Sequence, residues 1–391
     1  MSDLQQPKIN IDYILIFIVI LLCLTSVFTL ITLTPVLPEK YDPFNFPLRQ
    51  LLYYVLGAII IVLVMLVDYD RFKKITWIIY GIGMIPLFMI FLNFPSSLIE
   101  NYNGIARGIK LPFINIQPAE YFKIILTLVL AHIVSEHNQK HEVRTTKSDL
   151  LLLTKIAAAS APPMGLIVIQ PDLGSTLVLM AIAASIILVS GIQWRVLLTG
   201  IFAGLVAIGG VLGAWFLFPN TVGEYLQKTV FGHLQSRFYG WIYPEQFLES
   251  GYQLIRSMRA IGSGQLFGKG ISNMQVEVPE HHTDMIYTAI SEQFGFVGSC
   301  FVLMLLFLLI YRLLHIALKS NDQYGSYIVT GFIGLFAFQI FQNVGMSIQL
   351  LPITGVPLPF ISYGGSSILS YMLAIGIVLN IYSRTRTYMF E

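Results

Sequence analysis

YILIFIVILLCLTSVFTLITL, residues Tyr13–Leu33, is an unbroken apolar run without a single charged side chain. An α-helix needs about 20 apolar residues to cross the ~30 Å hydrocarbon core of a membrane, so this run predicts a membrane-spanning helix. No small-residue cleavage site follows it, and we expect it to remain as an anchor rather than to be removed as a signal peptide. Further runs of this kind lie at Leu51–Val67, Ile75–Leu92, Pro118–Val134, Leu150–Ile169, Leu173–Ser190, Val196–Leu217, Met285–Leu313, Gly325–Ile348 and Ser366–Tyr382.

The composition agrees with a membrane protein. Hydrophobic residues make up 55% and charged residues 11% of the 391 positions, and the mean hydropathy is +0.73. In a soluble domain about 25% of the residues are charged. We predict an all-α polytopic membrane protein of about ten transmembrane helices, with residues 1–391 forming one membrane domain. The net charge of +2 gives no sign of a nucleic-acid partner, and Cys23 and Cys300 lie within predicted spans, so no disulfide framework is expected.

The basic residues set the expected orientation, because short cytoplasmic loops carry an excess of Lys and Arg. With the N-terminus inside, the short outer loops carry only Lys40, Arg49, Arg107 and Lys110. The inner segments carry a longer series, namely Lys8, Arg71, Lys73, Lys74, Lys140, Arg144, Lys147, Arg195, Arg312, Lys319, Arg384 and Arg386. We therefore expect both termini in the cytoplasm.

The longest segment between spans runs from about residue 218 to about residue 283, between the seventh and eighth spans. On the expected topology it is extracytoplasmic, and loops of this length are usually functional. Within it, Tyr252–Ile261 is amphipathic and suited to the lipid headgroup region. Its apolar face consists of Leu254, Met258 and Ile261. Its basic face carries Arg256 and Arg259. The glycine-rich run Gly262–Gly270 is no nucleotide-binding loop, because Gly270 stands where Ser or Thr is required and no strand precedes it.

Polar and irregular segments at membrane depth point to the candidate site, because a charged side chain there costs about 2.5–3.5 kcal/mol and needs a partner or a cavity. Glu120 and Lys123, at the start of the fourth span, are spaced i, i+3 and share a helical face. They form either a simple intrahelical ion pair or the lining of an outer cavity. The run PITGVPLPFISYGGSS, Pro352–Ser367, has too many prolines and glycines for a helix and forms either an interfacial turn or a cavity lining.

A polar stripe marks the start of the eighth span. Asp284, Thr288, Ser291 and Glu292 are spaced i, i+4, i+7 and i+8, so they share a face that must contact protein or water. A role of Asp284 as a helix N-cap is the simpler alternative. It leaves Glu292, two turns deeper, without an explanation.

The neighbouring His281 and His282 raise the question of a metal. They lack the i, i+4 spacing with which a helix binds zinc, so no metal site built by protein ligands alone is expected. We expect instead that Mg²⁺ or Mn²⁺ binds through Asp284 together with a substrate phosphate. No organic cofactor is expected.

Together these segments resemble the SEDS family, whose members RodA and FtsW are peptidoglycan polymerases. The resemblance covers essentially the whole chain, and the short N-terminal segment is more similar to the RodA branch. The motifs that carry it are Asn103-Gly104, QPAEYFK at Gln117–Lys123, QPDLGST at Gln170–Thr176, GYQLIRSMRAIGSGQLFGKG at Gly251–Gly270, PEHHTDMIYTAISEQFG at Pro279–Gly295 and LPITGVPLPFISYGGSS at Leu351–Ser367.

The resemblance implies a bacterial cytoplasmic membrane protein that polymerises lipid II, an undecaprenyl-linked substrate, into glycan on the outer face for cell-wall elongation and cell shape. It also implies a class B penicillin-binding protein as partner. The family's essential aspartate corresponds to Asp284, and its conserved glutamate and lysine correspond to Glu120 and Lys123. The chain departs from the family pattern at Gly108, where a tryptophan is usual, at Ala119 and at Gln293.

Polymerisation joins a sugar hydroxyl to an anomeric carbon and expels a diphosphate-lipid. A carboxylate must accept the hydroxyl proton, and cations must hold the diphosphate. We assign Asp284 to the first role and expect Lys123 within ion-pair reach of it, with Glu120 close by. The residues assigned to substrate binding are Arg256, Arg259, Lys269, Asn103 and Ser366.

Two functions of other classes are alternatives. A lipid II flippase also needs a polar lipid pathway, but the polar residues concentrate in the outer half and no matched pair of broken helices marks a midplane site. A non-catalytic scaffold for a penicillin-binding protein does not need carboxylates such as Glu120, Asp284 and Glu292 at membrane depth.

Overall fold

The structure, a computed structural model, describes residues 11–37, 45–67, 69–102, 105–110, 115–217 and 232–385. Among these, nine helices are long and apolar enough to cross a membrane, and α6 is a shorter apolar helix of 17 residues. Each predicted span overlaps one of these helices, with ends that differ by no more than six residues, so the all-α polytopic fold is confirmed. The helices are α1 (Tyr13–Leu33), α2 (Phe46–Leu66), α3 (Tyr69–Leu92), α4 (Pro118–Lys140), α5 (Thr146–Ile169), α6 (Leu173–Val189), α7 (Trp194–Leu217), α11 (Ile286–Lys319), α12 (Gln323–Ser347) and α13 (Gly365–Arg384).

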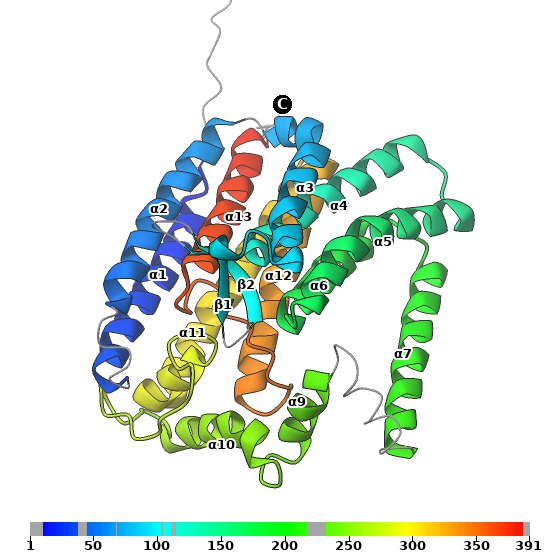
Figure 1. Ribbon diagram of the computed structural model, residues 1–391. Helices are drawn as coiled ribbons and strands as arrows, with labels where there is room; N and C mark the ends of the chain where they lie inside the picture. Colours follow the sequence, from blue (N-terminus) through cyan, green and yellow to red (C-terminus); the bar gives the residue numbers. More distant parts are fainter. Residues whose placement is uncertain are drawn as a thin grey trace, which may run out of the picture.

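Helix α4 is the most enclosed element of the bundle. Within its membrane window 83% of the residues are buried, against 17% for α2. It is also the least apolar of the nine spans, with a mean hydropathy of 1.4, as expected for a helix whose polar side chains must face protein instead of lipid. Helix α7 is the opposite case: none of its window is buried, and it stands apart from the bundle (Figure 1).

Both described ends of the chain lie at one end of the bundle, called here the terminal end. Asp12, which precedes α1, pairs with Arg312 of α11 over 2.8 Å. Asn380, near the end of α13, donates a hydrogen bond of 2.6 Å to the carbonyl of Val64, near the end of α2. The opposite end of the bundle carries α10 (Figure 1) and is called here the α10 end.

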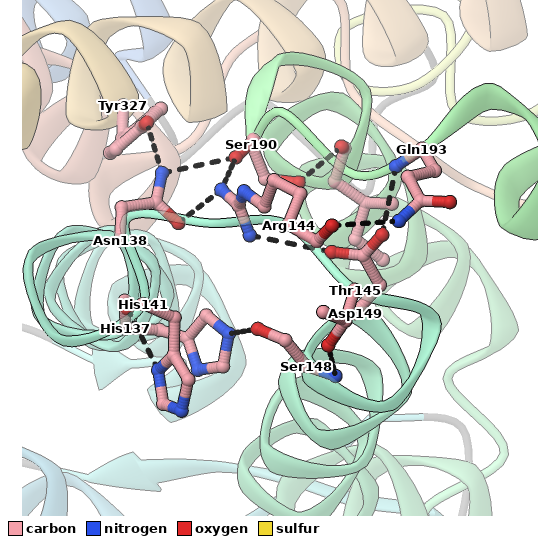
Figure 2. Close-up of polar contacts among 11 residues, drawn as sticks. His137, Asn138, His141, Arg144, Thr145, Ser148, Asp149, Ser190, Gln193 and Tyr327 are labelled. Atoms are coloured by element: carbon pink, nitrogen blue, oxygen red, sulfur yellow. Dashed lines mark hydrogen bonds and ion pairs between the residues drawn. The ribbon is translucent and has the colours of Figure 1, made fainter.

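A hydrogen-bond network centred on Arg144 fastens the terminal end (Figure 2). The Arg144 guanidinium donates to the carbonyl of Ser190 over 2.6 Å and lies 3.5 Å from the Asp149 carboxylate. Asn138 of α4 donates to the hydroxyl of Tyr327 of α12 over 2.8 Å. The network therefore joins α4, α5, α6 and α12 at the ends that lie farthest from the candidate site.

A small sheet lies between α3 and α4, and two short helices lie at the α10 end. Strands β1 (Ile99–Tyr102), β2 (Ile105–Lys110) and β3 (Asn115–Ile116) form an antiparallel sheet in that order. Helices α9 (Gly232–Ile242) and α10 (Leu248–Ser263) follow α7, and α10 lies across the end of the bundle (Figure 1). The long segment predicted between the seventh and eighth spans thus contains two helices, while its first part, residues 218–231, lies outside the described residues.

The predicted amphipathic stretch is confirmed as part of α10, but its buried face differs from the prediction. The buried residues are Gly251, Leu254, Ser257 and Ala260, whereas Met258 and Ile261 are only half-buried. The cause is a polar contact, because the Ser257 hydroxyl donates to the carbonyl of Ser347 at the end of α12 over 2.7 Å. Packing against α11 and α12 therefore sets the orientation of α10.

Helix α11 is interrupted near its start, and the glycine-rich run fills the interruption. Gly295 has φ of 64°, outside the helical region. The backbone N–H of Lys269 donates to the carbonyl of Glu292 over 2.9 Å, and that of Phe296 donates to the carbonyl of Gln265 over 2.8 Å. A Cβ atom on Gly268 would lie 2.0 Å from the carbonyl oxygen of Gln293. The glycines of this run thus allow its backbone to pack directly against the backbone of α11.

Candidate functional site

Asp284 lies at the α10 end, two residues before α11. The N-cap of α11 is Met285, without a side-chain capping bond, so the N-cap explanation of Asp284 is wrong. Its carboxylate accepts a hydrogen bond of 3.3 Å from the Thr283 hydroxyl. Burial, and then repulsion from Glu280, raises the pKa of Asp284 to about 7. A carboxyl group with such a pKa exchanges its proton near neutral pH, as a general base requires.

Two arginines that were not assigned to the site in the sequence interact with each other, and one of them, Arg237, also interacts with Asp284. Arg237 of α9 interacts electrostatically with Asp284, Asp172 and Arg107 of β2, and burial, followed by the repulsion from Arg107, lowers its pKa. Arg237 donates to the carbonyl of Ile353 over 3.4 Å, and Arg107 donates to that of Pro171 over 2.9 Å. In the described part of the chain neither forms an ion pair within 4.0 Å. The two like charges are therefore held together without a direct counter-ion.

The Glu120–Lys123 pair is buried at the start of α4. Lys123 Nζ lies 2.5 Å from Glu120 Oε1, and the two residues are 1% and 4% exposed. No ion pair of 4.0 Å or less joins Lys123 to Asp284, so the predicted direct contact is wrong. The reason is local geometry, because the i, i+3 spacing supplies Lys123 with a carboxylate on its own helix. The enclosed Tyr371 interacts electrostatically with Glu120, and Gln339 lies beside Tyr371.

The first turn of α4 is nevertheless tied to the arginine region. The side-chain amide of Gln117, one residue before α4, lies within hydrogen-bonding distance, 3.4 Å, of the Asp172 carboxylate. Asp172 in turn caps α6 by accepting the backbone N–H of Ser175 over 3.0 Å. This chain of contacts connects the start of α4 with the carboxylate that attracts Arg237.

Lys269 is engaged with a carboxylate of α11. Its Nζ lies 2.6 Å from Glu292 Oε1, whose side chain is completely enclosed. The same oxygen accepts the backbone N–H groups of Gln275 and Val276 over 2.9 and 3.2 Å. These contacts explain why Glu292 lies at membrane depth. The substrate role predicted for Lys269 requires it to leave this pair, so that role and the structural role seen here are alternatives.

Arg256 and Arg259 are both on α10. The Arg256 guanidinium lies 5.0 Å from the ring centroid of Tyr252 in a cation–π contact. Arg259 is exposed and lines a cavity of about 550 Å³ together with Tyr243 and Gln349. Neither has an ion-pair partner in the described ranges. Their assignment to substrate stays a prediction.

Ser366 fastens α13 to the start of α4. Its hydroxyl donates to the carbonyl of Asn115 over 3.0 Å and accepts the backbone N–H of Gln117 over 2.9 Å. Its predicted contact with substrate stays a prediction. Asn103 lies outside the described residues.

The two histidines before Asp284 serve packing. Burial, and then His282, lowers the pKa of His281 to about 4, so this imidazole is neutral near pH 7. The His282 ring lies 4.6 Å from the ring of Phe46. Within the described ranges, no group of three or more His, Cys, Asp and Glu side chains is placed to hold a metal ion.

A family model for cell-cycle proteins of the FtsW/RodA/SpoVE type matches residues 12–387. The chain belongs to this family. Stage V sporulation protein E of Bacillus subtilis (strain 168) is 32% identical over 97% of this chain and 100% of its own length. The probable peptidoglycan glycosyltransferase FtsW of Aliivibrio salmonicida is 30% identical over 98% of this chain and 92% of its own length.

Solved structures share the fold of this FtsW/RodA/SpoVE chain. The rod shape determining protein RodA of Thermus thermophilus superimposes with a TM-score of 0.68 at 25% identity, covering 98% of this chain and 100% of that one. A chain of a peptidoglycan synthase complex gives a TM-score of 0.75 at 24% identity, covering 97% of this chain and 99% of that one. The matches carry names from all three branches of the family, so the similarity to the RodA branch stays a prediction.

The family's usual tryptophan is replaced by Gly108, which lies on β2. It is paired with Glu100 of β1. A Cβ atom at Gly108 would lie 3.3 Å from the Glu100 carboxylate and 3.6 Å from the carbonyl of Ile116. The glycine therefore fits a closely packed three-stranded sheet at this point.

Proposed function

We propose that this chain is a peptidoglycan glycosyltransferase that polymerises lipid II into glycan strands at the outer face of the bacterial cytoplasmic membrane. The observation that carries the proposal is the group of charges around Asp284. A carboxyl group whose pKa is about 7 lies within the electrostatic reach of Arg237, which in turn interacts with Arg107. A base and a pair of cations are the two groups that transfer of a sugar from a diphosphate-lipid requires.

In the proposed reaction, Asp284 accepts the proton of the acceptor C4 hydroxyl. The hydroxyl oxygen bonds to the anomeric carbon of the donor, and the bond from that carbon to the diphosphate oxygen breaks. The diphosphate-lipid leaves with the electron pair of the broken bond. Its negative charge is held by Arg107 and Arg237, because a diphosphate between them relieves their mutual repulsion and makes charge-assisted hydrogen bonds to both.

Glu120 and Lys123 form the inner wall of the proposed site. Support comes from the contact of Gln117 with Asp172, which ties the start of α4 to the group that attracts Arg237. The enclosed ion pair keeps this region of α4 polar and charge-balanced in the membrane.

Mg²⁺ or Mn²⁺ is part of the proposal. The Asp284 carboxylate is repelled by Glu280, and a divalent cation on Asp284 offsets such repulsion. Its remaining ligands would be phosphate oxygens of the substrate and water, the ligands that these cations prefer. When bound, the cation supplies positive charge to the departing diphosphate.

The orientation follows from the basic residues. Arg144 lies in the connection between α4 and α5 at the terminal end, and Arg71, Lys140, Lys147 and Arg195 lie in the helix turns next to connections at this end. Since cytoplasmic loops are the ones enriched in Lys and Arg, we place the terminal end and both termini in the cytoplasm. The α10 end, with Asp284, then faces outward.

A class B penicillin-binding protein is the proposed partner, with cell-wall elongation and cell shape as the process. One chain of a peptidoglycan synthase complex shares this fold, and that complex coordinates polymerization with crosslinking. A polymerase of this fold needs a crosslinking enzyme to join its glycan products. We therefore expect the partner to raise the yield of crosslinked product.

The test uses the purified full-length chain in detergent with lipid II and a divalent cation, with and without a class B penicillin-binding protein. Glycan formed by the chain in the absence of any transmembrane gradient supports the proposal. No glycan under either condition contradicts it. Transport of lipid II in vesicles without polymerisation would then indicate a flippase, and neither transport nor polymerisation would indicate a scaffold.

A further inference from the structure

The backbone that carries Asp284 is held by three consecutive carbonyl groups. Each accepts a hydrogen bond from a residue distant in sequence. Two of the three donors come from the irregular segment between α12 and α13, and the third comes from α12. The contacts are Tyr363 N–H to the His282 carbonyl over 2.9 Å, Ser362 Oγ to the Thr283 carbonyl over 2.6 Å, and Asn343 Nδ2 to the Asp284 carbonyl over 2.7 Å.

Asn343 joins this backbone to the irregular segment with one amide nitrogen. Its Nδ2 also donates to the carbonyl of Val356 over 2.8 Å. The side chain is completely enclosed, and its Oδ1 has no hydrogen-bond partner. The Asn343 side chain therefore forms two hydrogen bonds, and it donates both, to the carbonyls of Asp284 and Val356.

The irregular segment is itself anchored from its other side by α1 and α2. The Ser26 hydroxyl donates to the carbonyl of Ile361 over 2.7 Å, and the Gln50 amide donates to that of Ser362 over 3.1 Å. The Tyr54 hydroxyl donates to the carbonyl of Phe360. Ser362 thus connects helices α1 and α2 with the backbone next to Asp284, the proposed base.

These contacts matter because Asp284 lies outside the regular helix. The α-helical ladder begins only at Ile286, and the turn before it is held by the Met285 N–H bond of 3.1 Å to the Glu280 carbonyl. The direction of the carboxylate therefore depends on what holds residues 282–284. A misplacement of about 1 Å in a reacting group costs a rate factor of about 100.

We propose that Asn343 and Ser362 are positioning residues that fix Asp284 at the reacting hydroxyl by holding two consecutive backbone carbonyls. The inference rests on the proposed function, in which Asp284 is the base. Among the described residues, neither side chain forms a hydrogen bond with the Asp284 carboxylate itself. Their loss therefore lowers the turnover rate while leaving the affinity for lipid II intact.

The experiment compares Asn343→Leu, which keeps the approximate size and removes the donor, with Gln342→Leu as matched control. Gln342 is the neighbouring amide on α12 and donates to the Pro352 carbonyl over 2.9 Å, and in the described part of the chain it forms no hydrogen bond with residues 282–284. We expect Asn343→Leu to lower kcat for lipid II polymerisation by about 10- to 100-fold with KM within about threefold. Gln342→Leu is expected to keep both constants within about twofold.

Ser362 supplies a graded series that does not depend on the folding of the Asn343 variant. Ser362→Cys retains a weak donor and Ser362→Ala has none, so kcat is expected to fall in the order Ser, Cys, Ala at constant KM. Folding of each variant is checked by its melting temperature in detergent. Folded Asn343 or Ser362 variants with unchanged kcat, beside an inactive Asp284→Asn, overturn the positioning role alone. An active Asp284→Asn protein removes the base assignment of the proposed function instead.

Discussion

The Lys269–Glu292 pair offers a test that separates a structural from a substrate-binding role. In Lys269→Met the enclosed Glu292 carboxylate loses its cation at 2.6 Å and keeps two backbone N–H donors at 2.9 and 3.2 Å. Removing one partner of a buried ion pair costs about 3–5 kcal/mol. Because Lys269 is 17% exposed and the two N–H groups remain, we place the loss near the lower end, at about 3 kcal/mol.

A double-mutant cycle makes the effect specific. Glu292→Gln is expected to cost less, because the amide oxygen still accepts both N–H groups and Lys269 reaches water. The double variant is expected to be more stable than the sum of the single losses implies, with a coupling of about 1–3 kcal/mol. The measurement is thermal unfolding in detergent, in which a loss of this size lowers the melting temperature by several degrees.

The same variants are assayed for lipid II polymerisation at a temperature at which all remain folded. The expected result is a KM for lipid II that changes little in Lys269→Met. A protein with the wild-type melting temperature and a tenfold higher KM would refute this reasoning and return Lys269 to the substrate.

Three further predictions concern the site and its frame. Without added divalent cation, kcat/KM should fall about tenfold per pH unit below about pH 7 and level off above it, because the base must be deprotonated and the pKa of Asp284 is about 7; Glu280→Gln, like a cation bound to Asp284, should move this limb to lower pH, and a flat profile down to pH 5 without cation contradicts the assignment. Arg107→Ala and Arg237→Ala should each raise KM for lipid II at least about tenfold through loss of a charge-assisted contact, measured by steady-state kinetics, whereas an unchanged KM in both excludes them from the diphosphate. Gly268→Ala should lower the melting temperature, because the added Cβ would lie 2.0 Å from the Gln293 carbonyl oxygen and displace the glycine-rich run from the interruption of α11. A wild-type melting temperature would contradict this prediction.

The helices and one ion pair were predictable because both depend on local sequence. The run Tyr13–Leu33 needs no knowledge of its neighbours to be assigned to a membrane. Glu120 and Lys123 share a helical face by spacing alone, and the structure pairs them at 2.5 Å. The same dependence on local sequence explains why the predicted ion pair of Lys123 with Asp284 is wrong, since Glu120 on the same helix offers Lys123 a closer carboxylate.

What the sequence did not disclose depends on contacts between distant segments. Arg107 comes from a small sheet and Arg237 from α9, and no spacing rule brings these two together. The interruption of α11 at Gly295 is created by the glycine-rich run that docks into it. In the sequence this run resembled a nucleotide loop, and only its backbone contacts reveal its role. Asn343 carries no signal in the sequence, because a polar residue on a membrane helix has many possible partners.

The measurement that tests the account most directly is glycan synthesis by purified Asp284→Asn protein. The amide keeps the size of the side chain and the backbone contacts of residues 282–284, and it removes the group that accepts the proton. We expect lipid II to bind as in the wild type, the melting temperature to be unchanged, and polymerisation to fall at least about 100-fold. A folded Asp284→Asn protein that makes glycan at a near-normal rate would contradict the central assignment.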